Sequence, residues 1–409
     1  MKISNTLSLL LILSAISSLS CQSKTANPTA PAGDFTSLPL FLNQWCGNGA
    51  GNGQFSQLEG ITSDSVGNIY ACDAGNSRIE KFDPTGKLLS QWGSPGSIVG
   101  AFNNPTGIAV TGNDVYITDS GNNRVQEFDT SGNYITGWGS TGAGVSLFNN
   151  PQGIAVDQYS DVYVVDQGND RIQKFFAGGA APLTWGSAGS GPASFNSPTG
   201  IALDNSGNVY VTDTLNNRVQ RFTPTGTYQN TWGAYGTNPA QFRSPEGITF
   251  DASGNIYVAD SANGRIQKFD ASFNYLSQWG GLGSNIGQFQ VPFSIAITSS
   301  PTYFYIADIG TNCVKRFGPP AEYSIFPNPV MPGENLTISF NSAYYIGYLI
   351  QITDMNGTVV FNDLGQAVAG NNAVQWNVMS GGTRVQTGVY LLDFTLGHTQ
   401  VSEKISVVN

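Results

Sequence analysis

Apolar and polar residues alternate in short runs along the middle of this chain, and the same order of runs recurs about every 47 residues. One unit, starting at Asn104, reads NPTGIAVTGNDVYITDSGNNRVQEFDTSGNYITGWGS. Its pattern predicts four short strands, a to d, separated by turns rich in Gly, Asn and Ser, at 107–110, 115–119, 124–129 and 134–138. No helical period of 3.6 residues appears in the unit. Four antiparallel strands repeated around an axis are typical of a propeller blade.

Single residue types mark the repeat along the chain. Tryptophans recur at steps of 47, 46, 47, 47 and 47 residues, at Trp45, Trp92, Trp138, Trp185, Trp232 and Trp279. A Phe and an Asp keep the same step within one residue, and an Arg follows five residues after the Asp in five of the six units. We expect the Trp and Phe rings to pack between blades. We expect each Asp to cap the turn between strands b and c and to pair with its Arg. A ring of charge around one face is the alternative reading.

These units resemble the NHL-repeat family. The matching residues are the NPxGIA opening, the VYVTD strand, the NNRVQ segment and the closing Trp-Gly, six times over from Asn43 to Phe317. The resemblance implies an all-β, six-bladed β-propeller. The sixth unit departs from the pattern, because Ser294 replaces the Gly and Cys313 replaces the Arg.

The sixth unit stops after strand c, at Phe317, while an orphan strand d lies ahead of the first unit at 38–45. Pairing these two strands closes a propeller over 37–320 and removes its exposed edges. In a complete blade the register places Arg124 opposite Gly139. The equivalent residues in the closing blade are Cys313 and Cys46, which predicts a disulfide between them, two free buried thiols being the alternative. Cys72 aligns with small core residues.

The ends of the chain carry export signals. Residues 1–21 read as a signal peptide with a short apolar run, too short to span a membrane. Cys21 follows Ser-Leu-Ser, which resembles a lipoprotein cleavage site and predicts a lipid on its thiol; ordinary secretion is the alternative. Residues 22–36 read as a polar, Pro-containing linker.

The period vanishes in the C-terminal part, 322–409, where seven short alternating strands predict a β-sandwich. This part resembles the Ig-like domain of flagellar hook-capping proteins and the C-terminal sorting domain of type IX secretion cargo. The matching residues are 326–329 (FPNP), 354–357 (DMNG), Trp376, 388–390 (GVY) and 404–408 (KISVV). The resemblance implies delivery to the outer membrane, the cell surface or the outside. A plain accessory sandwich is the alternative, and a sorting domain beside a lipid anchor would be an unusual pair.

The amino-acid composition disfavours several classes of catalytic site and of binding partner. The 409 residues hold 11% charged residues, with a net charge of −10 and a single histidine, His398. Zinc enzymes and His-based triads need well-placed imidazoles, so neither is expected. From 34 to 320 there are 13 basic and 21 acidic residues, which disfavours nucleic acid as a partner. Electrostatic binding to anionic lipid is disfavoured by the same excess of acidic residues, which leaves a lipid anchor as the membrane contact. We expect a monomer.

The residue that precedes each Gly-Ile pair enters strand a beside the central channel. Blade by blade these residues are Glu59, Thr106, Gln152, Thr199, Glu246 and Phe293. If strand a lines the channel, they form a ring of ligand-binding candidates at its mouth. The carboxylates of Glu59 and Glu246 are ligands that Ca²⁺ accepts. Ordinary solvated residues at the channel mouth are the alternative.

Two functions remain open. A non-catalytic scaffold at the cell surface would bind a protein or a glycan through the loops between strands d and a, and would need no cofactor. The sequence favours this reading, because it offers no nucleophile motif and no catalytic residues can be named. The alternative is a calcium-dependent lyase or hydrolase with its site at the channel mouth, since some related propellers are metal-dependent enzymes. The amidating lyase among them relies on His ligands, and this propeller contains no His.

Overall fold

The computed structural model describes residues 39–177, 181–285, 287–298, 302–318, 323–326, 328, 330–331, 334–342, 346–368, 370–380, 383–396 and 399–408. The predicted signal peptide, the predicted lipidation site Cys21, the predicted linker 22–36 and His398 lie outside these residues. No helix within the described ranges is long and apolar enough to cross a membrane. The helical elements of these ranges are short 3-10 turns, each joining strand b to strand c: η2 (Ala74–Asn76), η3 (Ser120–Asn122), η4 (Gln167–Asn169), η5 (Thr214–Asn216) and η6 (Ser261–Asn263).

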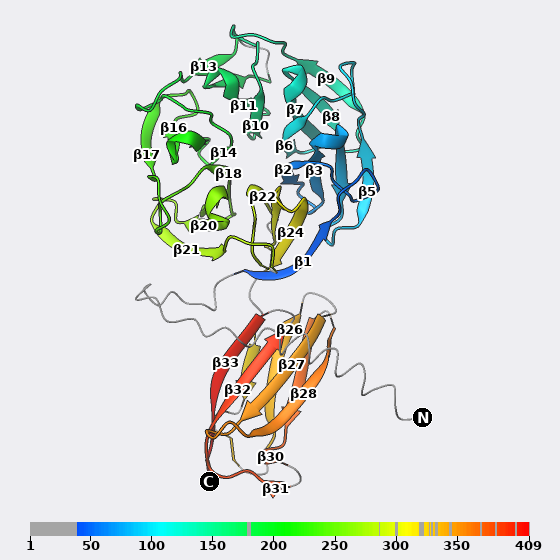
Figure 1. Cartoon of the computed structure of the whole chain (residues 1–409), viewed down its shortest axis with the longest axis vertical. Coiled ribbons are helices and arrows are strands. Elements are labelled where there is room, and N and C mark those ends of the chain that lie inside the picture. Colours follow the sequence, from blue (N-terminus) through cyan, green and yellow to red (C-terminus); the bar gives the residue numbers. More distant parts are fainter. Residues whose placement is uncertain are drawn as a thin grey trace. The chain divides into compact units, whose positions relative to one another are not determined.

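Six sheets of four antiparallel strands surround a common centre and form the propeller (Figure 1). Blades 1 and 2 consist, in the order a to d, of β2 (Leu58–Ser63), β3 (Ile69–Asp73), β4 (Arg78–Phe82), β5 (Leu88–Trp92), and β6 (Pro105–Thr111), β7 (Asp114–Asp119), β8 (Arg124–Asp129), β9 (Tyr134–Trp138). Blades 3 to 5 consist, in the same order, of β10 (Pro151–Val156), β11 (Val162–Asp166), β12 (Arg171–Phe175), β13 (Leu183–Trp185); β14 (Ile201–Leu203), β15 (Val209–Asp213), β16 (Arg218–Phe222), β17 (Tyr228–Trp232); and β18 (Pro245–Phe250), β19 (Ile256–Asp260), β20 (Arg265–Phe269), β21 (Tyr275–Gly280).

Blade 6 is completed by the N-terminal strand. Its strands are β22 (Pro292–Ile297), β23 (Phe304–Asp308), β24 (Cys313–Gly318) and, as strand d, β1 (Leu40–Cys46). β1 pairs antiparallel with β24 from Leu40↔Gly318 to Cys46↔Cys313, as the orphan strand predicts. The inner strands β22 and β2 contact each other, so the ring of six sheets is closed.

Both departures of the sixth unit lie at the seam of the ring, which consists of the β1–β24 pairing within blade 6 and of the contact between blade 6 and blade 1. Cys46 and Cys313 form a disulfide, which confirms the pairing predicted from the register. Ser294 stands where the other blades have Gly, and its Oγ accepts a hydrogen bond from the Ile61 N–H at 3.1 Å. Asn312 Oδ1 accepts another from the Leu58 N–H at 3.1 Å. The chain thus changes the repeat where two distant segments have to be joined.

The glycine that recurs in strand a of the other five blades has a steric cause. A methyl group on Gly107 would lie 2.2 Å from the carbonyl oxygen of Gln152 in the next blade. The same group on Gly60 would lie 2.2 Å from the carbonyl oxygen of Thr106. The inner strands therefore approach one another more closely than a Cβ atom allows.

At five of the six blade interfaces the Trp of strand d packs against the Phe of strand c in the next blade, which confirms the predicted inter-blade role of these rings. The ring centroids of Trp92 and Phe128 lie 6.2 Å apart, and those of Trp138 and Phe175 lie 5.5 Å apart. Where other c–d turns place a glycine against the Trp ring, blade 5 has Phe273, which stacks on Trp232 at 4.3 Å. These aromatic contacts bury apolar surface along the full height of the blade interfaces.

The Asp and Arg five residues apart form ion pairs in five blades, which confirms the predicted pairing. Their Asp Oδ2 and Arg Nε atoms are 2.6–2.8 Å apart, and the Asp side chains are 0% exposed. The predicted cap of the b–c turn is wrong, because the Asp side chains make no capping hydrogen bond to the 3-10 turns. In blade 6, Cys313 occupies the Arg position because it forms the disulfide. Lys315, two residues further on, supplies the cation instead, and its Nζ lies 2.7 Å from Asp308 Oδ2.

The C-terminal part folds into two sheets that share one core. The first contains β25 (Tyr323–Phe326), β26 (Leu336–Ser342) and β29 (Gly370–Trp376), and the second β28 (Val359–Ala367), β27 (Ile346–Thr353), β32 (Gly388–Leu396) and β33 (Thr399–Val407). Ile338 and Trp376 of the first sheet cluster with Ile350 and Leu392 of the second. The seven predicted strands are all present. The short pair β30 (Met379–Ser380) and β31 (Thr383–Arg384) was not predicted, because two residues show no alternation.

Candidate functional site

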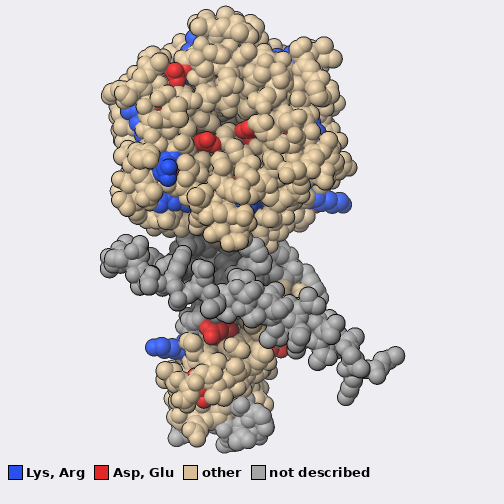
Figure 2. Space-filling view, in the orientation of Figure 1, with Lys and Arg blue, Asp and Glu red and all other residues tan. Residues whose placement is uncertain are grey.

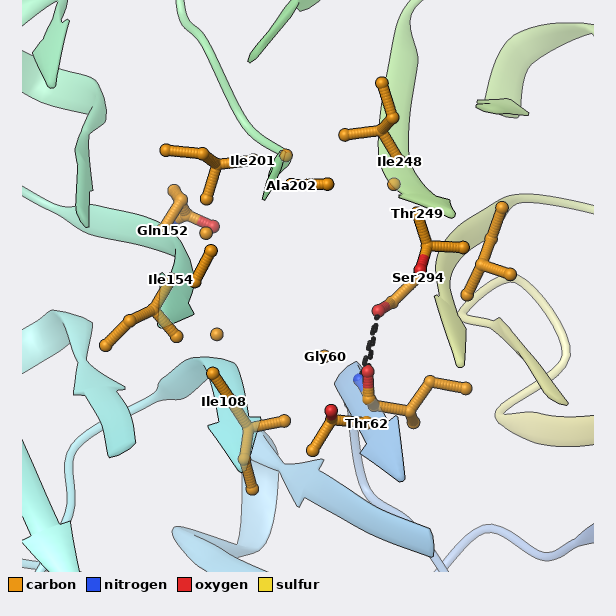
Figure 3. Close-up of a pocket in the computed structure, with 18 of the residues that line it drawn as sticks. Gly60, Thr62, Ile108, Gln152, Ile154, Ile201, Ala202, Ile248, Thr249 and Ser294 are labelled. Carbon is orange, nitrogen blue, oxygen red and sulfur yellow. Dashed lines mark hydrogen bonds between the residues drawn. The ribbon is translucent and has the colours of Figure 1, made fainter. Parts of the chain in front are cut away.

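The inner strands of the six blades line a central channel with a volume of about 300 Å³ (Figure 3). Its wall is mixed: Ile and Ala side chains from several blades surround the opening together with Thr, Gln and Ser side chains. Thr106, Gln152, Thr199 and Glu246 belong to the lining, as does Phe293. Glu59 is not part of the lining, although the adjacent Gly60 is. The structure therefore brings four of the five candidate ligand-binding residues to the channel.

The two threonine hydroxyls of this set are hydrogen-bonded within the propeller. Thr106 Oγ1 lies 3.1 Å from Thr118 Oγ1 and donates to the Pro151 carbonyl at 3.2 Å. Thr199 Oγ1 accepts a hydrogen bond from Thr214 Oγ1 at 2.9 Å. Because these oxygens already have partners, they have little capacity left for a ligand.

Two of the candidate residues carry carboxyl groups: Glu59 is buried and Glu246 is partly buried. Burial, and then the charge of Glu59, raise the pKa of Glu246 to about 8. Burial also raises the pKa of Glu59, against a hydrogen bond that Gln57 Nε2 donates to Glu59 Oε1 at 2.6 Å. Glu246 Oε2 is buried without a hydrogen-bond partner among the described residues. The carboxyl group of Glu246 therefore changes its charge near neutral pH.

The groups that could hold a metal are few at this mouth. Within the described ranges, no three His, Cys, Asp or Glu side chains gather closely enough to hold an ion. Ca²⁺ takes six to eight oxygen ligands as a rule. The thiol of Cys72 is buried near Glu59 and Asp73, and its pKa is raised above its ordinary value chiefly by burial, so this Cys is a core residue of blade 1. What the channel offers chemically is the carboxyl group of Glu246, whose pKa burial raises to about 8.

Replacing Glu246 by glutamine is expected to stabilise the protein more as the pH rises. The folded-state pKa of Glu246, about 8, exceeds the ordinary value of 4.5, so wild type loses stability between those two pH values. Glutamine does not titrate and keeps the same shape. We expect the variant to gain roughly 1–3 kcal/mol over wild type at pH 9 and much less at pH 5. Urea unfolding at both pH values measures this difference. An equal gain at pH 5 and pH 9 would contradict the assignment.

A second candidate binding surface consists of the loops that connect strand d to the next strand a. Large apolar side chains on these loops are 57–76% exposed: Ile98, Val99, Val145, Tyr235 and Leu282. Leu215, on the 3-10 turn η5, adds a sixth exposed apolar side chain at the same end of the blades. In the visible view of the propeller, charged groups are sparse, with acidic groups near the centre and basic groups mainly toward the edge (Figure 2). The sequence showed these loops as Gly/Ser-rich, but not which apolar residues they expose.

Comparisons with known proteins agree with this architecture. The family model described as NHL repeat matches 102–128, 195–222 and 242–269, which lie in blades 2, 4 and 5. The model described as secretion system C-terminal sorting domain matches 324–408. No match is found among the curated proteins.

Solved structures show a similar fold at low identity. A protein of unknown function from Bacteroides thetaiotaomicron is 20% identical over 66% of this chain and 72% of its own, with a TM-score of 0.51. A streptogramin B lyase is 16% identical over 90% of this chain and 99% of its own, with a TM-score of 0.49. A gluconolactonase from Xanthomonas campestris is 14% identical over 64% and 85%, with a TM-score of 0.48. Identities this low carry nothing about activity.

The matched sorting domain indicates export to the cell surface or outer membrane. The chain is therefore an exported protein that carries NHL repeats in its propeller and a type IX secretion sorting domain in its C-terminal sandwich.

Proposed function

We propose that this protein is a non-catalytic scaffold that binds a partner protein outside the cell through the d–a loops of its propeller. The observation that carries the proposal is the set of exposed apolar side chains on loops that the fold holds rigidly. Large apolar side chains left exposed on surface loops provide area that a partner protein can bury. Loops placed by a rigid scaffold are where proteins most often carry binding residues.

In five blades the Arg at the start of strand c holds the preceding d–a loop in place. Arg124 Nη1 and Nη2 donate to the carbonyl oxygens of Ser97, Ile98 and Ala101 at 2.8–2.9 Å. A Phe at the base of each loop, such as Phe102, is 0% exposed. The backbone bonds Gly96 N–H to Phe102 O and Phe102 N–H to Ser94 O close the loop at 2.9 Å. Pre-ordered loops lose little conformational entropy when they bind a partner.

A protein partner suits the loops better than a glycan does. Sugar rings are commonly bound by stacking on aromatic side chains, and Tyr235 is the aromatic member of the exposed set. The other members are aliphatic. Tyr235 also lies under the guanidinium of Arg243, at 5.7 Å from its ring centre. The acidic balance of the propeller argues against nucleic acid.

The enzyme alternative has one observation in its favour, the unpartnered oxygen of Glu246 beside Glu59. A cation held there would need further ligands from its substrate, because Thr106 and Thr199 are already hydrogen-bonded. Calcium titration separates the two proposals. Tight binding that disappears in a Glu59→Gln/Glu246→Gln variant would favour a calcium-dependent lyase or hydrolase.

Removing the aliphatic side chains from the loops is expected to abolish partner binding without unfolding the propeller. In an Ile98→Ser/Val99→Ser/Leu282→Ser variant, we expect at least about tenfold weaker binding to the protein that crosslinks to wild type on intact cells, because each removed side chain contributes about 1 kcal/mol or more when buried at an interface. The matched control is Val66→Ser/Tyr159→Ser, which removes exposed apolar side chains from the a–b turns at the other end of the blades. Equal loss in both variants, or unchanged binding in the loop variant, would refute the proposal.

A further inference from the structure

A second cavity, of about 390 Å³, lies between blade 2 and blade 3, away from the channel and the d–a loops. Tyr116, Glu127 and Trp138 of blade 2 line one side of it. Ser160, Val162, Phe175, Phe176 and Ala177 of blade 3 line the other. Phe175 is the partly exposed member of the six strand-c phenylalanines, while Phe82, Phe128, Phe222, Phe269 and Phe317 are buried.

The other five blades show what this position ordinarily contains. Each strand b carries a Tyr, as its second residue in five blades and its third in blade 2, and this Tyr pairs directly across the sheet with the residue before the strand-c Phe. In five blades that residue is a cation whose charged group lies over the Tyr ring at 4.7–5.8 Å: Lys81 over Tyr70, Lys174 over Tyr163, Arg221 over Tyr210, Lys268 over Tyr257 and Arg316 over Tyr305. The repeat therefore builds a cation–π contact at this place.

Blade 2 has a carboxylate where the others have the cation. Glu127 faces Tyr116 across the strands, and Asp114, at the start of strand b, lies close enough to raise its pKa. Burial is the larger cause of that rise, and a hydrogen bond with Tyr116 opposes it. Among the described residues, no Lys or Arg forms an ion pair with Glu127 or Asp114. The nearby Lys174 is paired with Asp161, with Nζ and Oδ2 2.9 Å apart.

We infer that the cavity between blades 2 and 3 binds an organic cation, an ammonium or guanidinium group, which takes the place of the missing Lys or Arg beside Tyr116. The ring of Tyr116 supplies the same kind of π-face on which the equivalent Tyr of each of the other five blades holds a cation. Trp138 and Phe175 add aromatic walls, and Glu127 supplies the opposite charge. A partly buried carboxylate beside aromatic rings favours an ammonium or guanidinium over a hydrated metal ion. The volume suits a single Lys or Arg side chain of a partner, or a small free amine.

Titration with small cations tests the site in the full-length protein. The probes are acetyl-lysine methylamide, acetyl-arginine methylamide and n-butylammonium, with the uncharged acetyl-norleucine methylamide as control. Binding is followed through the indole N–H resonances of the tryptophans, one of which, Trp138, lies in the cavity. We expect the three cations to shift the Trp138 signal and the norleucine analogue to bind at least about tenfold more weakly. Tighter binding of the amino-acid derivatives than of n-butylammonium would identify a protein side chain as the ligand, and equal binding a free amine.

Two substitutions of Glu127 make the test decisive. Glu127→Lys restores the residue type of the other five blades, so the variant should fold. Its lysine side chain should fill the cavity from within and abolish binding of the small cations. Glu127→Gln keeps the shape without the charge and should weaken cation binding at least about tenfold. Unchanged binding in either variant, equal binding of the norleucine analogue, or a response to CaCl₂ without a response to the amines would overturn the inference.

Discussion

Exchanging Cys46 and Cys313 together for serine is expected to lower the free energy of unfolding of the propeller by about 2–5 kcal/mol. The disulfide joins residues 267 positions apart, so it encloses nearly the whole ring. In the chain-entropy account, a cross-link restricts the unfolded chain more as the enclosed loop grows, and loops of this length belong to the upper end of that range. Without the bond, the seam is held by the pairing of β1 with β24 and by the hydrogen bonds of Ser294 and Asn312.

Urea unfolding measured by tryptophan fluorescence suits this test, because six of the seven tryptophans lie in the propeller. Reduction with dithiothreitol provides the internal control. Wild type should lose stability on reduction until it resembles the variant, while the Cys46→Ser/Cys313→Ser variant should not respond. The buried thiol of Cys72 is present in both proteins and cannot account for a difference. A wild-type stability that does not change on full reduction would show that the seam does not depend on the disulfide.

The disulfide could be predicted from the sequence because the repeat supplies its own reference. Five complete blades fix which strand-c residue faces which strand-d residue, as the observed pair Arg265↔Gly280 shows. Reading the same register in the incomplete unit brings Cys46 opposite Cys313. The roles of the repeated Trp, Phe, Asp and Arg follow from the same logic, since a residue needed in every blade serves packing or loop attachment.

The channel mouth could be predicted in position but not in chemistry. Strand a had to line the channel, and Thr106 and Gln152 are found there. The sequence does not tell where a hydroxyl points, and the Thr106 and Thr199 oxygens are engaged within the propeller. The coupling of Glu59 with Glu246 depends on burial and on the width of the channel, which no spacing reveals.

The sequence predicts one feature of the site beside Glu127, its charge, but not the other, its open space. The strand-c series Lys81, Glu127, Lys174, Arg221, Lys268 and Arg316 contains one acidic member, and this irregularity is visible in the sequence. In a repeat, identical positions serve packing, whereas an exception such as Glu127 can carry specificity. The open space next to it could not be foreseen, since it depends on how Phe176 and Ala177 leave strand c of blade 3.

Replacing Arg218 by methionine is expected to destabilise the propeller by about 3–5 kcal/mol, because it leaves the Asp213 carboxylate buried without its cation. Asp213 Oδ2 lies 2.6 Å from Arg218 Nε, and the Asp side chain is 0% exposed. The same Arg donates to the carbonyl oxygens of Ser190, Gly191 and Ser194 at 2.8 Å, so the loop before blade 4 should also lose its attachment. We expect faster proteolytic cleavage within 186–195 in the variant, while cleavage in the other d–a loops stays unchanged.

Blade 6 suggests a second substitution that should restore stability to the Arg218→Met variant. There Lys315 pairs with Asp308 and donates to the Gln288 carbonyl, because Cys313 occupies the Arg position. Gln220 is the residue of blade 4 that corresponds to Lys315. Adding Gln220→Lys to Arg218→Met should therefore recover at least half of the lost stability, since it restores a cation to Asp213 by a route the fold already uses. Adding Asp213→Asn should also reduce the loss, by removing the unpaired charge. If neither second substitution restored stability, the cost of Arg218→Met would have to come from the lost loop contacts rather than from the buried carboxylate.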